Sequence, residues 1–303
     1  MLATKNSNIS LIGVPMQFGA DRAGVEMGPT AIRSSNIQTR LEALGYRVND
    51  LGDIHVNRVQ DGYGPVAKLK YLAEIARVNE ELAQVVSQEM GNGQLPLVIG
   101  GDHSIAIGTI KGVLQHKSRL GVIWFDAHTD VNTAETTGSG NIHGMSLAVL
   151  LGYGHPSLVS IAGEHTRVNP RNVVIIGARS VDPGERIFLK EQGIRVFTMY
   201  DIDKYGMKAV MEEAMERVTA GTDGVHLSLD LDGMDPMEAP GVGTPVRGGM
   251  SYRESHFAME MLHESGMLVS AEVVEVNPIL DQNNMTAKAA VELVGSVFGE
   301  RIL

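Results

Sequence analysis

Three short segments carry aspartate and histidine at spacings suited to metal binding. They are Gly-Gly-Asp-His103-Ser, Asp126-Ala-His128-Thr-Asp130 and Ser228-Leu-Asp230-Leu-Asp232. Alternate side chains of an extended segment point the same way, so the ligands within each of the last two segments share a face. Together the segments offer six ligands, enough for two metal ions. A metal pair can lower the pKa of a shared water until hydroxide is available at neutral pH, so the pattern indicates hydrolytic chemistry.

The donor atoms indicate which metal would bind. The six residues are four aspartates and two histidines, and the chain has no cysteine, which excludes thiolate sites and disulfides. Mostly hard oxygen donors suit Mn²⁺ better than a closed structural Zn²⁺ site, with Co²⁺, Ni²⁺ and Fe²⁺ as alternatives. The competing interpretation is a solvated acidic rim, but carboxylates packed together without cations would repel one another and lose solvation.

Each ligand segment follows a short apolar run. The runs are Pro96–Ile99, Leu120–Phe125 and Val225–Leu229. Such runs are typical of strands that are buried on both faces of a sheet. Ligands that follow them are expected at the carboxyl edge of a parallel α/β sheet, where the binding sites of open sheets lie.

Apolar runs and amphipathic stretches alternate along the whole chain, which predicts a parallel sheet covered by helices on both faces. The expected strands are Ile9–Val14, Arg47–Leu51, Leu97–Ile99, Gly121–Phe125, Val173–Ile176, Val196–Thr198, Val225–Leu229 and Leu268–Val276. The expected helices are Pro29–Leu44, Val66–Glu89, Ile105–Gln115, Pro183–Gln192, Met207–Val218, Tyr252–Glu264 and Thr286–Phe298. With no linker or internal repeat, we expect a single domain over residues 1–303.

The composition excludes several classes of partner. Lys and Arg total 25 against 36 Asp and Glu, a formal net charge of −11, and no basic cluster stands out, so we expect no nucleic acid partner. The N-terminal residues are polar, and no apolar stretch approaches the roughly 20 residues of a membrane helix, so we expect neither export nor a membrane. A cytoplasmic location is the expectation, in keeping with the absence of cysteine.

Four motifs stand out when the chain is taken as a whole. They are G-G-D-H-S at 100–104, D-A-H-T-D at 126–130, S-L-D-L-D-G-M-D-P at 228–236 and P-G-V-G-T-P at 240–245. Together they resemble the ureohydrolase family of binuclear manganese enzymes, and the similarity runs nearly end to end. The resemblance implies a three-layer αβα sandwich around an eight-stranded, mostly parallel sheet, and assembly into a homotrimer or homohexamer.

The resemblance also implies a specific set of metal ligands, with two Mn²⁺ per subunit. One ion would be held by His103, Asp126, Asp130 and Asp230, and the other by Asp126, His128, Asp230 and Asp232. Asp126 and Asp230 would bridge the two ions. In the family a hydroxide also bridges them, and the aspartate that matches Asp130 accepts a hydrogen bond from that hydroxide.

The loop after the second motif resembles the arginase group of this family, in which it recognises the α-carboxylate of L-arginine. By this match Asn132 and Ser139 would contact the carboxylate directly, and Thr137 and Asn141 directly or through water. Neutral donors of this kind bind a carboxylate without cancelling the anionic field of the metal site.

Two further carboxylates, Asp182 and Glu185, match the family positions that receive the α-amino group of the substrate. Agmatine has an amine but no carboxylate, so an enzyme for agmatine would not need the loop described above. The resemblance therefore implies hydrolysis of the guanidinium group of L-arginine to L-ornithine and urea.

Glu275 follows an apolar strand, where a carboxylate is costly unless it is paired. The resemblance supplies the substrate guanidinium as its partner, with Thr244 nearby, and the alternative is an internal arginine such as Arg179. His143 matches the family's proton-shuttle histidine, a role suited to a side chain that titrates near neutral pH. The alternative for His143 is an ordinary surface residue. Asp130 is expected to pass a proton to the leaving nitrogen.

Three other functions remain open at this point. A sibling ureohydrolase would act on agmatine, guanidinobutyrate or formiminoglutamate and would not require the α-carboxylate of arginine. A deacetylase-like hydrolase would prefer one Zn²⁺ and would not use His103 and Asp130 as metal ligands. A noncatalytic sensor would not need a hydroxide generator, so the presence of all six ligands with His143 and Glu275 argues against it.

Overall fold

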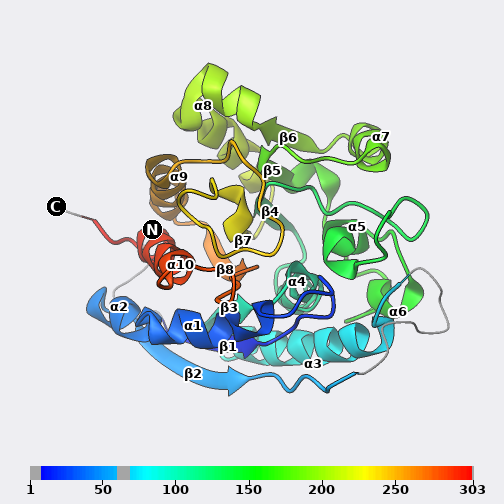
Figure 1. Ribbon diagram of the computed structural model, residues 1–303, viewed down its shortest axis with the longest axis horizontal. Helices are drawn as coiled ribbons and strands as arrows, with labels where there is room; N and C mark the ends of the chain where they lie inside the picture. Colours follow the sequence, from blue (N-terminus) through cyan, green and yellow to red (C-terminus); the bar gives the residue numbers. More distant parts are fainter. Residues whose placement is uncertain (1–7, 60–68, 302–303) are drawn as a thin grey trace.

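The computed structural model describes residues 8–59 and 69–301. Its centre is an eight-stranded sheet in the order β2-β1-β3-β8-β7-β4-β5-β6 (Figure 1). The strands are β1 (Asn8–Val14), β2 (Arg47–Asp53), β3 (Leu95–Gly100), β4 (Leu120–Phe125), β5 (Val173–Ala178), β6 (Arg195–Thr198), β7 (Gly224–Asp230) and β8 (Leu268–Val274). Every neighbouring pair is parallel, so the predicted eight strands and parallel sheet are confirmed.

Helices cover both faces of the sheet and give the predicted three layers (Figure 1). They are α1 (Gly28–Ser34), α2 (Ile37–Ala43), α3 (Leu72–Gly91), α4 (Ala106–Leu114), α5 (Ser146–Leu150), α6 (Pro156–Val159), α7 (Pro183–Gln192), α8 (Met199–Thr219), α9 (Tyr252–Ser265) and α10 (Met285–Val297). One face packs against α1, α2, α8, α9 and α10, and the other against α3 to α7.

Three helices differ in their bounds from the sequence expectation. The helix expected over 29–44 is two helices, α1 and α2, because Asn36 between them adopts a left-handed backbone conformation (φ 67°). The helix expected over 207–218 is the second part of α8, which bends at Gly206 (φ 79°). A left-handed residue interrupts a right-handed helix, and Gly and Asn adopt that conformation most easily. The helix expected from Val66 begins at Leu72, and its first three expected residues, 66–68, lie outside the described residues.

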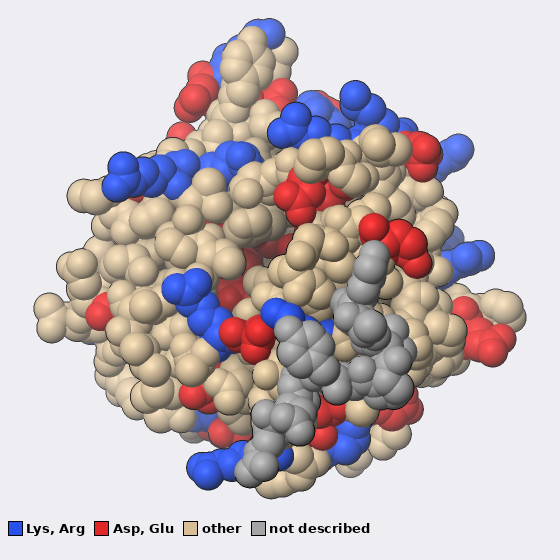
Figure 2. All heavy atoms as spheres, turned by 45° about the vertical axis from the view of Figure 1, so that its right-hand side comes forward, with Lys and Arg blue, Asp and Glu red and all other residues tan. Residues whose placement is uncertain are grey.

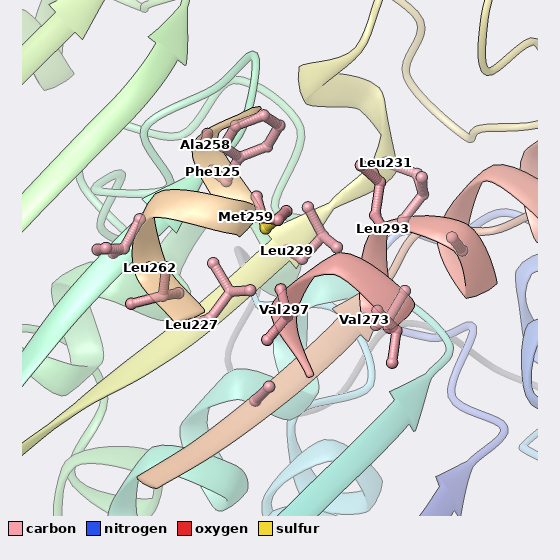
Figure 3. Packing of buried hydrophobic residues seen from close by; sticks show 14 of the residues in the cluster. Phe125, Leu227, Leu229, Leu231, Ala258, Met259, Leu262, Val273, Leu293 and Val297 are labelled. Atoms are coloured by element: carbon pink, nitrogen blue, oxygen red, sulfur yellow. The ribbon is translucent and has the colours of Figure 1, made fainter. Parts of the chain in front are cut away.

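The strands divide their side chains between two hydrophobic cores. In β4, Ile123 and Phe125 belong to one core and Val122 and Trp124 to the other, as the alternation of side chains along a strand requires. Figure 3 shows part of the first core, where β7 and β8 pack against α9 and α10 through Leu227, Leu229, Met259, Leu262, Val273, Leu293 and Val297.

The order of the sheet sets the position of the site. Four central strands, β3, β8, β7 and β4, lie side by side. Because they are parallel, their carboxyl ends meet at one edge of the sheet. The predicted ligand segments follow three of these strands, and Glu275 follows the fourth.

Candidate active site

The predicted metal ligands and Glu275 lie at the carboxyl ends of four neighbouring strands, at one edge of the sheet. β3 leads to His103, β4 to Asp126, β7 to Asp230 and β8 to Glu275. The six predicted metal ligands all come together there. Five of them are buried, and the side chain of His128 is 25% exposed.

The first group of ligands surrounds one nitrogen of His103. Its Nδ1 atom lies 3.1 Å from both Asp130 Oδ2 and Asp230 Oδ2. Asp126 Oδ2 lies 3.2 Å from the same nitrogen, which makes no hydrogen bond. The other nitrogen, Nε2, lies 2.7 Å from Ser228 Oγ. Nδ1 therefore faces the carboxylates as a metal-binding nitrogen would.

The second group is built around His128. Its Nδ1 atom lies 3.0 Å from Asp232 Oδ2 and 3.4 Å from Asp126 Oδ1. Asp126 thus turns one oxygen toward His128 and the other toward His103. In each of the groups His103, Asp126, Asp230 and Asp126, His128, Asp232, the ligand atoms lie within 4.8 Å of one another. A carboxylate shared in this way is placed to bridge two ions.

The spacing of these atoms fits divalent metal ions. Ligand atoms about 2.1 Å from an ion in octahedral or tetrahedral coordination lie roughly 3.0–3.5 Å from one another. The nitrogen–oxygen distances at His103 and His128 fall within that range. The donors are carboxylate oxygens and imidazole nitrogens, a set that Mn²⁺ accepts.

The carboxylates of the site require positive charge. Burial, together with the charge of Asp126, raises the pKa of Asp232 to about 6. Burial and the charges of Asp232 and Asp126 also raise the pKa of Asp230. Burial opposes a charged His128, but Asp232 and Asp126 outweigh it and raise the pKa of this imidazole to about 12. Divalent cations would meet the same need for charge and leave the histidine nitrogens free to bind them.

Two site residues adopt a left-handed backbone conformation that side chains other than glycine rarely take. Asp130 has φ 50° and Glu275 has φ 65°. Neighbouring backbone holds each of them, because Leu147 donates its N–H to the Asp130 carbonyl (3.0 Å) and Glu275 donates its own N–H to the Gly101 carbonyl (2.9 Å). Such conformations concentrate at functional sites, where the surrounding structure over-determines them.

Glu275 is paired inside the protein through one carboxylate oxygen only. Its Oε1 atom accepts the backbone N–H of His103 at 2.9 Å and lies 3.0 Å from His143 Nδ1, whereas Oε2 is buried without a hydrogen-bond partner. The alternative pairing with Arg179 is wrong, because that guanidinium donates to backbone carbonyls such as Val246 O (2.7 Å). Burial disfavours a charged His143, but the bond to Glu275 outweighs it and raises the pKa of His143 to about 9.

The site opens into a small pocket of about 140 Å³. Predicted residues that line it are His128, Asp130, Asn132, Ser139, His143, Asp182, Glu185, Asp230, Asp232 and Thr244. Figure 2 turns this side of the molecule toward the viewer and shows carboxylates at the floor of a recess. A larger cavity of about 730 Å³ lies beside β6 and the start of α8, but none of the six predicted ligands lines it.

Thr137, Asn141 and Thr244, predicted to bind substrate, have side chains that bond to other parts of the protein. Thr137 Oγ1 accepts the backbone N–H of Gly140 at 3.0 Å, and Asn141 Nδ2 donates to Ala20 O at 2.8 Å. Thr137 and Asn141 do not line the pocket. Thr244 Oγ1 donates to Asp232 Oδ2 at 3.0 Å. Thr244 therefore supports a predicted metal ligand from the pocket wall, whereas Thr137 and Asn141 shape the loop.

A capping box at the start of α7 fixes the two carboxylates expected to receive an amine. Asp182 is the N-cap, and Glu185 Oε2 accepts its backbone N–H at 2.9 Å. Glu185 Oε1 accepts the N–H of Val131 at 3.1 Å, and Asp182 Oδ2 accepts from Asn132 Nδ2 at 3.0 Å. These bonds tie α7 to the loop that follows Asp130, so both parts of the pocket keep one relative position.

Three buried side chains that contact the site were missed by the sequence interpretation. Trp124 stacks on His103 with ring centroids 4.1 Å apart and donates Nε1–H to Asp126 Oδ2 at 2.9 Å. Ser228, beside His103, donates to Glu272 Oε1 at 2.7 Å. Two signals could have found them. Trp124 and Ser228 each precede a predicted ligand by two positions and so share its face, and Glu272 is a charged residue within an apolar strand.

Asp102 is a fourth residue that the sequence interpretation did not use. Its Oδ2 atom accepts the backbone N–H of Gly19 at 2.8 Å, and Oδ1 accepts that of Ser104 at 3.0 Å. The Gly19 carbonyl in turn accepts the N–H of His143 at 3.2 Å. A Cβ on Gly19 would lie 2.2 Å from Asp102 Oδ1, so only glycine allows this approach. Asp102 thereby positions the backbone on which His143 rests.

Comparison with known proteins decides the family. The model of the arginase family matches residues 7–299 of the chain. The chain belongs to the arginase family. An arginase from Brevibacillus brevis is 57% identical over 298 residues, which cover 98% of this chain and 100% of that protein.

Solved structures of the arginase family share the fold. Arginase from Bacillus caldovelox superposes with a TM-score of 0.96 at 55% identity, over 98% of this chain and 100% of that one. Entamoeba histolytica arginase in complex with L-ornithine gives a TM-score of 0.90 at 36% identity, over 97% and 99% of the two chains. The predicted family and αβα fold are confirmed. The protein is therefore a hydrolase of a metal-dependent family, and its two His/Asp groups could hold metal ions.

Proposed function

We propose that this member of the arginase family hydrolyses the guanidinium group of L-arginine to L-ornithine and urea. The observation that carries the proposal is the sheet edge that holds both His/Asp groups and the buried Glu275. His143, the partner of Glu275, lines the adjoining pocket together with the neutral side chains of Asn132 and Ser139. The relatives compared above, which are arginases, support the same substrate.

The proposed cofactor is two Mn²⁺ per subunit. One ion would be held by His103, Asp126, Asp130 and Asp230, and the other by Asp126, His128, Asp230 and Asp232. When bound, the metal ions would lower the pKa of water and so supply, at neutral pH, the nucleophile that attack on a guanidinium carbon requires. The part of the protein is to hold the ligand atoms in place, as Ser228 does for His103 and Thr244 for Asp232.

The guanidinium group of the substrate would meet Glu275. A buried carboxylate oxygen without a partner favours a cation that can donate N–H bonds to it, and a guanidinium does so with directed, charge-assisted bonds. The Oε1 atom is held by the His103 backbone and by His143, which fixes the plane of the carboxylate. The substrate would therefore be aligned as well as attracted, with Thr244 beside it.

The amino-acid end of the substrate would bind at the rim of the pocket. Asn132 and Ser139 line the pocket and would donate to the α-carboxylate, while Asp182 and Glu185 would receive the α-amino group. Both oxygens of Glu185 already accept backbone N–H bonds, so its contact with the amine would use the remaining lone pairs. Thr137 and Asn141 would act through water or through the shape of the loop.

His143 and Asp130 would handle the protons. His143 lines the pocket, and with a pKa of about 9 it is protonated at neutral pH. It would donate its proton to the leaving nitrogen or restore one from bulk water. Asp130, which also lines the pocket, would take a proton from the nucleophile and pass it to the ornithine nitrogen.

Urea release by the Mn²⁺-loaded protein tests the proposal, with L-arginine and agmatine offered in parallel and a metal-stripped sample as control. Urea from L-arginine alone, lost on stripping, is the expected result. Turnover of agmatine in preference to L-arginine would overturn the assignment of the carboxylate loop. Turnover of neither would overturn the substrate and leave another amidine, such as guanidinobutyrate or formiminoglutamate, to be tried.

We infer the assembly and setting from the family resemblance. The chain is proposed to be one domain over residues 1–303 that forms a homotrimer or homohexamer in the cytoplasm, without a nucleic acid or membrane partner. Among residues 8–59 and 69–301, no helix is long and apolar enough to cross a membrane. Sedimentation of the Mn²⁺-loaded protein would test the assembly, and a monomer at micromolar concentration would contradict it.

A further inference from the structure

One face of the sheet carries buried polar residues among its apolar ones. On the side covered by α3 and α4, β7 contributes His226 and Ser228, and β8 contributes Ser270 and Glu272, all fully buried. The strand register places Ser228 beside Glu272 and His226 beside Ser270. The next strand, β3, places the apolar Val98 beside Glu272. These four polar residues form a cross-strand cluster that we call the sheet relay.

The sheet relay ends at His103. Glu272 Oε1 accepts the hydroxyl proton of Ser228 at 2.7 Å, and the same hydroxyl oxygen lies 2.7 Å from His103 Nε2. On the other side, His226 Nε2 lies 3.5 Å from Glu272 Oε1, and His226 Nδ1 lies 2.8 Å from Ser270 Oγ. Glu272 is therefore linked to His103 by hydrogen bonds through Ser228, whereas His226 Nε2 approaches it without a hydrogen bond.

The direction of each hydrogen bond follows from a count of protons. A carboxylate can only accept, and a serine hydroxyl has one proton to donate. Since Ser228 donates that proton to Glu272, its oxygen can only accept from His103, which must carry hydrogen on Nε2. A metal-binding imidazole carries one proton, so Nδ1 keeps the lone pair that faces the three aspartates.

The stability of the fold does not by itself account for a carboxylate at this position. A well-packed apolar side chain in place of a buried ionic group is often neutral or stabilising. Residues behind a ligating histidine, by contrast, set its tautomer and orientation and so tune the affinity for the metal. The position of Glu272 behind Ser228 matches this second role.

We propose that Glu272 is a positioning residue that acts through Ser228 to hold His103 with its proton on Nε2 and its Nδ1 lone pair directed at the metal site. The inference rests on the proposed function in one respect, the role of His103 as a metal ligand. Beyond that function, Glu272 would set the affinity of the site for a divalent cation, although Ser228 and His103 lie between it and the ion.

The test is the dissociation constant for Mn²⁺, measured by calorimetric titration of the metal-stripped full-length protein without substrate. Glu272→Met removes the acceptor of the Ser228 proton, so the hydroxyl can turn and donate to His103 Nε2 instead. That bond would favour the tautomer of His103 that has no hydrogen on Nε2. We expect the dissociation constant to rise by about 10- to 100-fold. Because no turnover is measured, the result does not depend on the identity of the substrate.

A double variant separates action through Ser228 from a direct effect of the Glu272 charge. If the relay operates as proposed, Ser228→Ala weakens Mn²⁺ binding, and Ser228→Ala combined with Glu272→Met weakens it no further. Glu89→Met is the matched control, because Glu89 on α3 is another buried carboxylate that accepts from a serine, Ser10 on β1. Its Mn²⁺ dissociation constant should stay within a factor of about two of the wild-type value.

Glu272→Gln covers the case in which the Met variant fails to fold, since it keeps the shape but accepts more weakly. It should weaken Mn²⁺ binding in the same direction by at least about threefold. An unchanged dissociation constant in the folded Glu272 variants, or fully additive losses in the double variant, overturns the relay. His103→Ala distinguishes the two proposals. If it leaves Mn²⁺ binding unchanged, the metal assignment fails, and if it weakens binding while the Glu272 variants do not, only the relay fails.

Discussion

His143, which lines the pocket, forms a direct pair with the buried Glu275, since His143 Nδ1 lies 3.0 Å from Glu275 Oε1. The same oxygen accepts the backbone N–H of His103 at 2.9 Å. One carboxylate oxygen thus joins the proposed proton carrier to a segment that holds a predicted metal ligand. The second oxygen, Oε2, is buried without a hydrogen-bond partner. The positions of the proposed proton donor and of the predicted metal ligand are therefore coupled through a single side chain.

Glu275→Gln tests that coupling. The neutral amide keeps the shape but loses the charge that would align the guanidinium and hold a proton on His143. We expect kcat/KM for L-arginine to fall by roughly 10²- to 10³-fold, measured as urea release at saturating Mn²⁺. Glu89→Gln, a buried carboxylate on α3 away from the site, should keep its activity. A loss of less than about threefold in Glu275→Gln would contradict the assigned role.

Metal binding should stabilise the fold. The buried carboxylates of the site repel one another, as the raised pKa values of Asp230 and Asp232 indicate, and divalent cations relieve this repulsion. For each of the two proposed sites, Mn²⁺ at a concentration 100 times its dissociation constant should add about 2.7 kcal/mol to the free energy of unfolding. Urea denaturation with and without chelator measures the effect. Asp230→Ala should lose most of the stabilisation by Mn²⁺. A wild-type denaturation midpoint that does not change with Mn²⁺ would argue against the site.

Gly101→Ala should destabilise the protein strongly. A Cβ at Gly101 would lie 2.3 Å from Met16 O and 2.7 Å from Val14 O, and these backbone atoms cannot move aside without displacing β1. We expect a loss of about 3 kcal/mol or more in the free energy of unfolding. Gly91→Ala at the end of α3 is the control, because its Cβ would meet only the His116 ring, at 3.4 Å or more. Similar midpoints for the two variants would refute the packing argument.

Lys111 should make stability rise with pH on the alkaline side. This amine in α4 is fully buried and donates to the carbonyls of Thr166 (2.8 Å) and Val159. Burial lowers its pKa from 10.5 to about 8. Between these values the unfolded chain holds a proton that the folded chain has lost, so the free energy of unfolding increases as pH rises from about 8 to about 10.5. Below about 8 both states are protonated and the cost of burying the charge is constant.

The contribution of Lys111 is measured as the difference between the wild type and Lys111→Met in urea denaturation across that pH range. The subtraction removes the effects of other groups that titrate at high pH. The wild type should gain stability relative to the variant as pH rises. A difference that does not change with pH would show that the two carbonyls compensate fully for burial of the ammonium group.

The sequence alone predicts the features that depend on local pattern. The spacing of two residues in Asp126-x-His128 and Asp230-x-Asp232 predicts that the ligands of each pair lie close together on one face of an extended chain. The ligands do come together, but the extended conformation is wrong for the second pair, because Leu231–Gly233 is a 3-10 helix. Apolar runs of strand length predict the inner strands, because burial on both faces requires them. The edge strand β2 is mostly exposed and was predicted without such a run. The ends of the helices do not follow from the apolar pattern. A left-handed Asn36 splits one expected helix into two, and α8 starts before its expected first residue and continues across a kink at Gly206.

The tertiary structure alone decides which distant residues become neighbours. His103 and Glu275 are 172 positions apart, and they meet because the sheet order sets β3 beside β8, which no local pattern encodes. The same order places Ser228 between His103 and Glu272. The residues around Glu275 in the sequence are also compatible with an internal ion pair between Glu275 and Arg179. The free energy of a buried charge depends on what lies within a few ångströms of it, and strand order rather than spacing along the chain determines that environment.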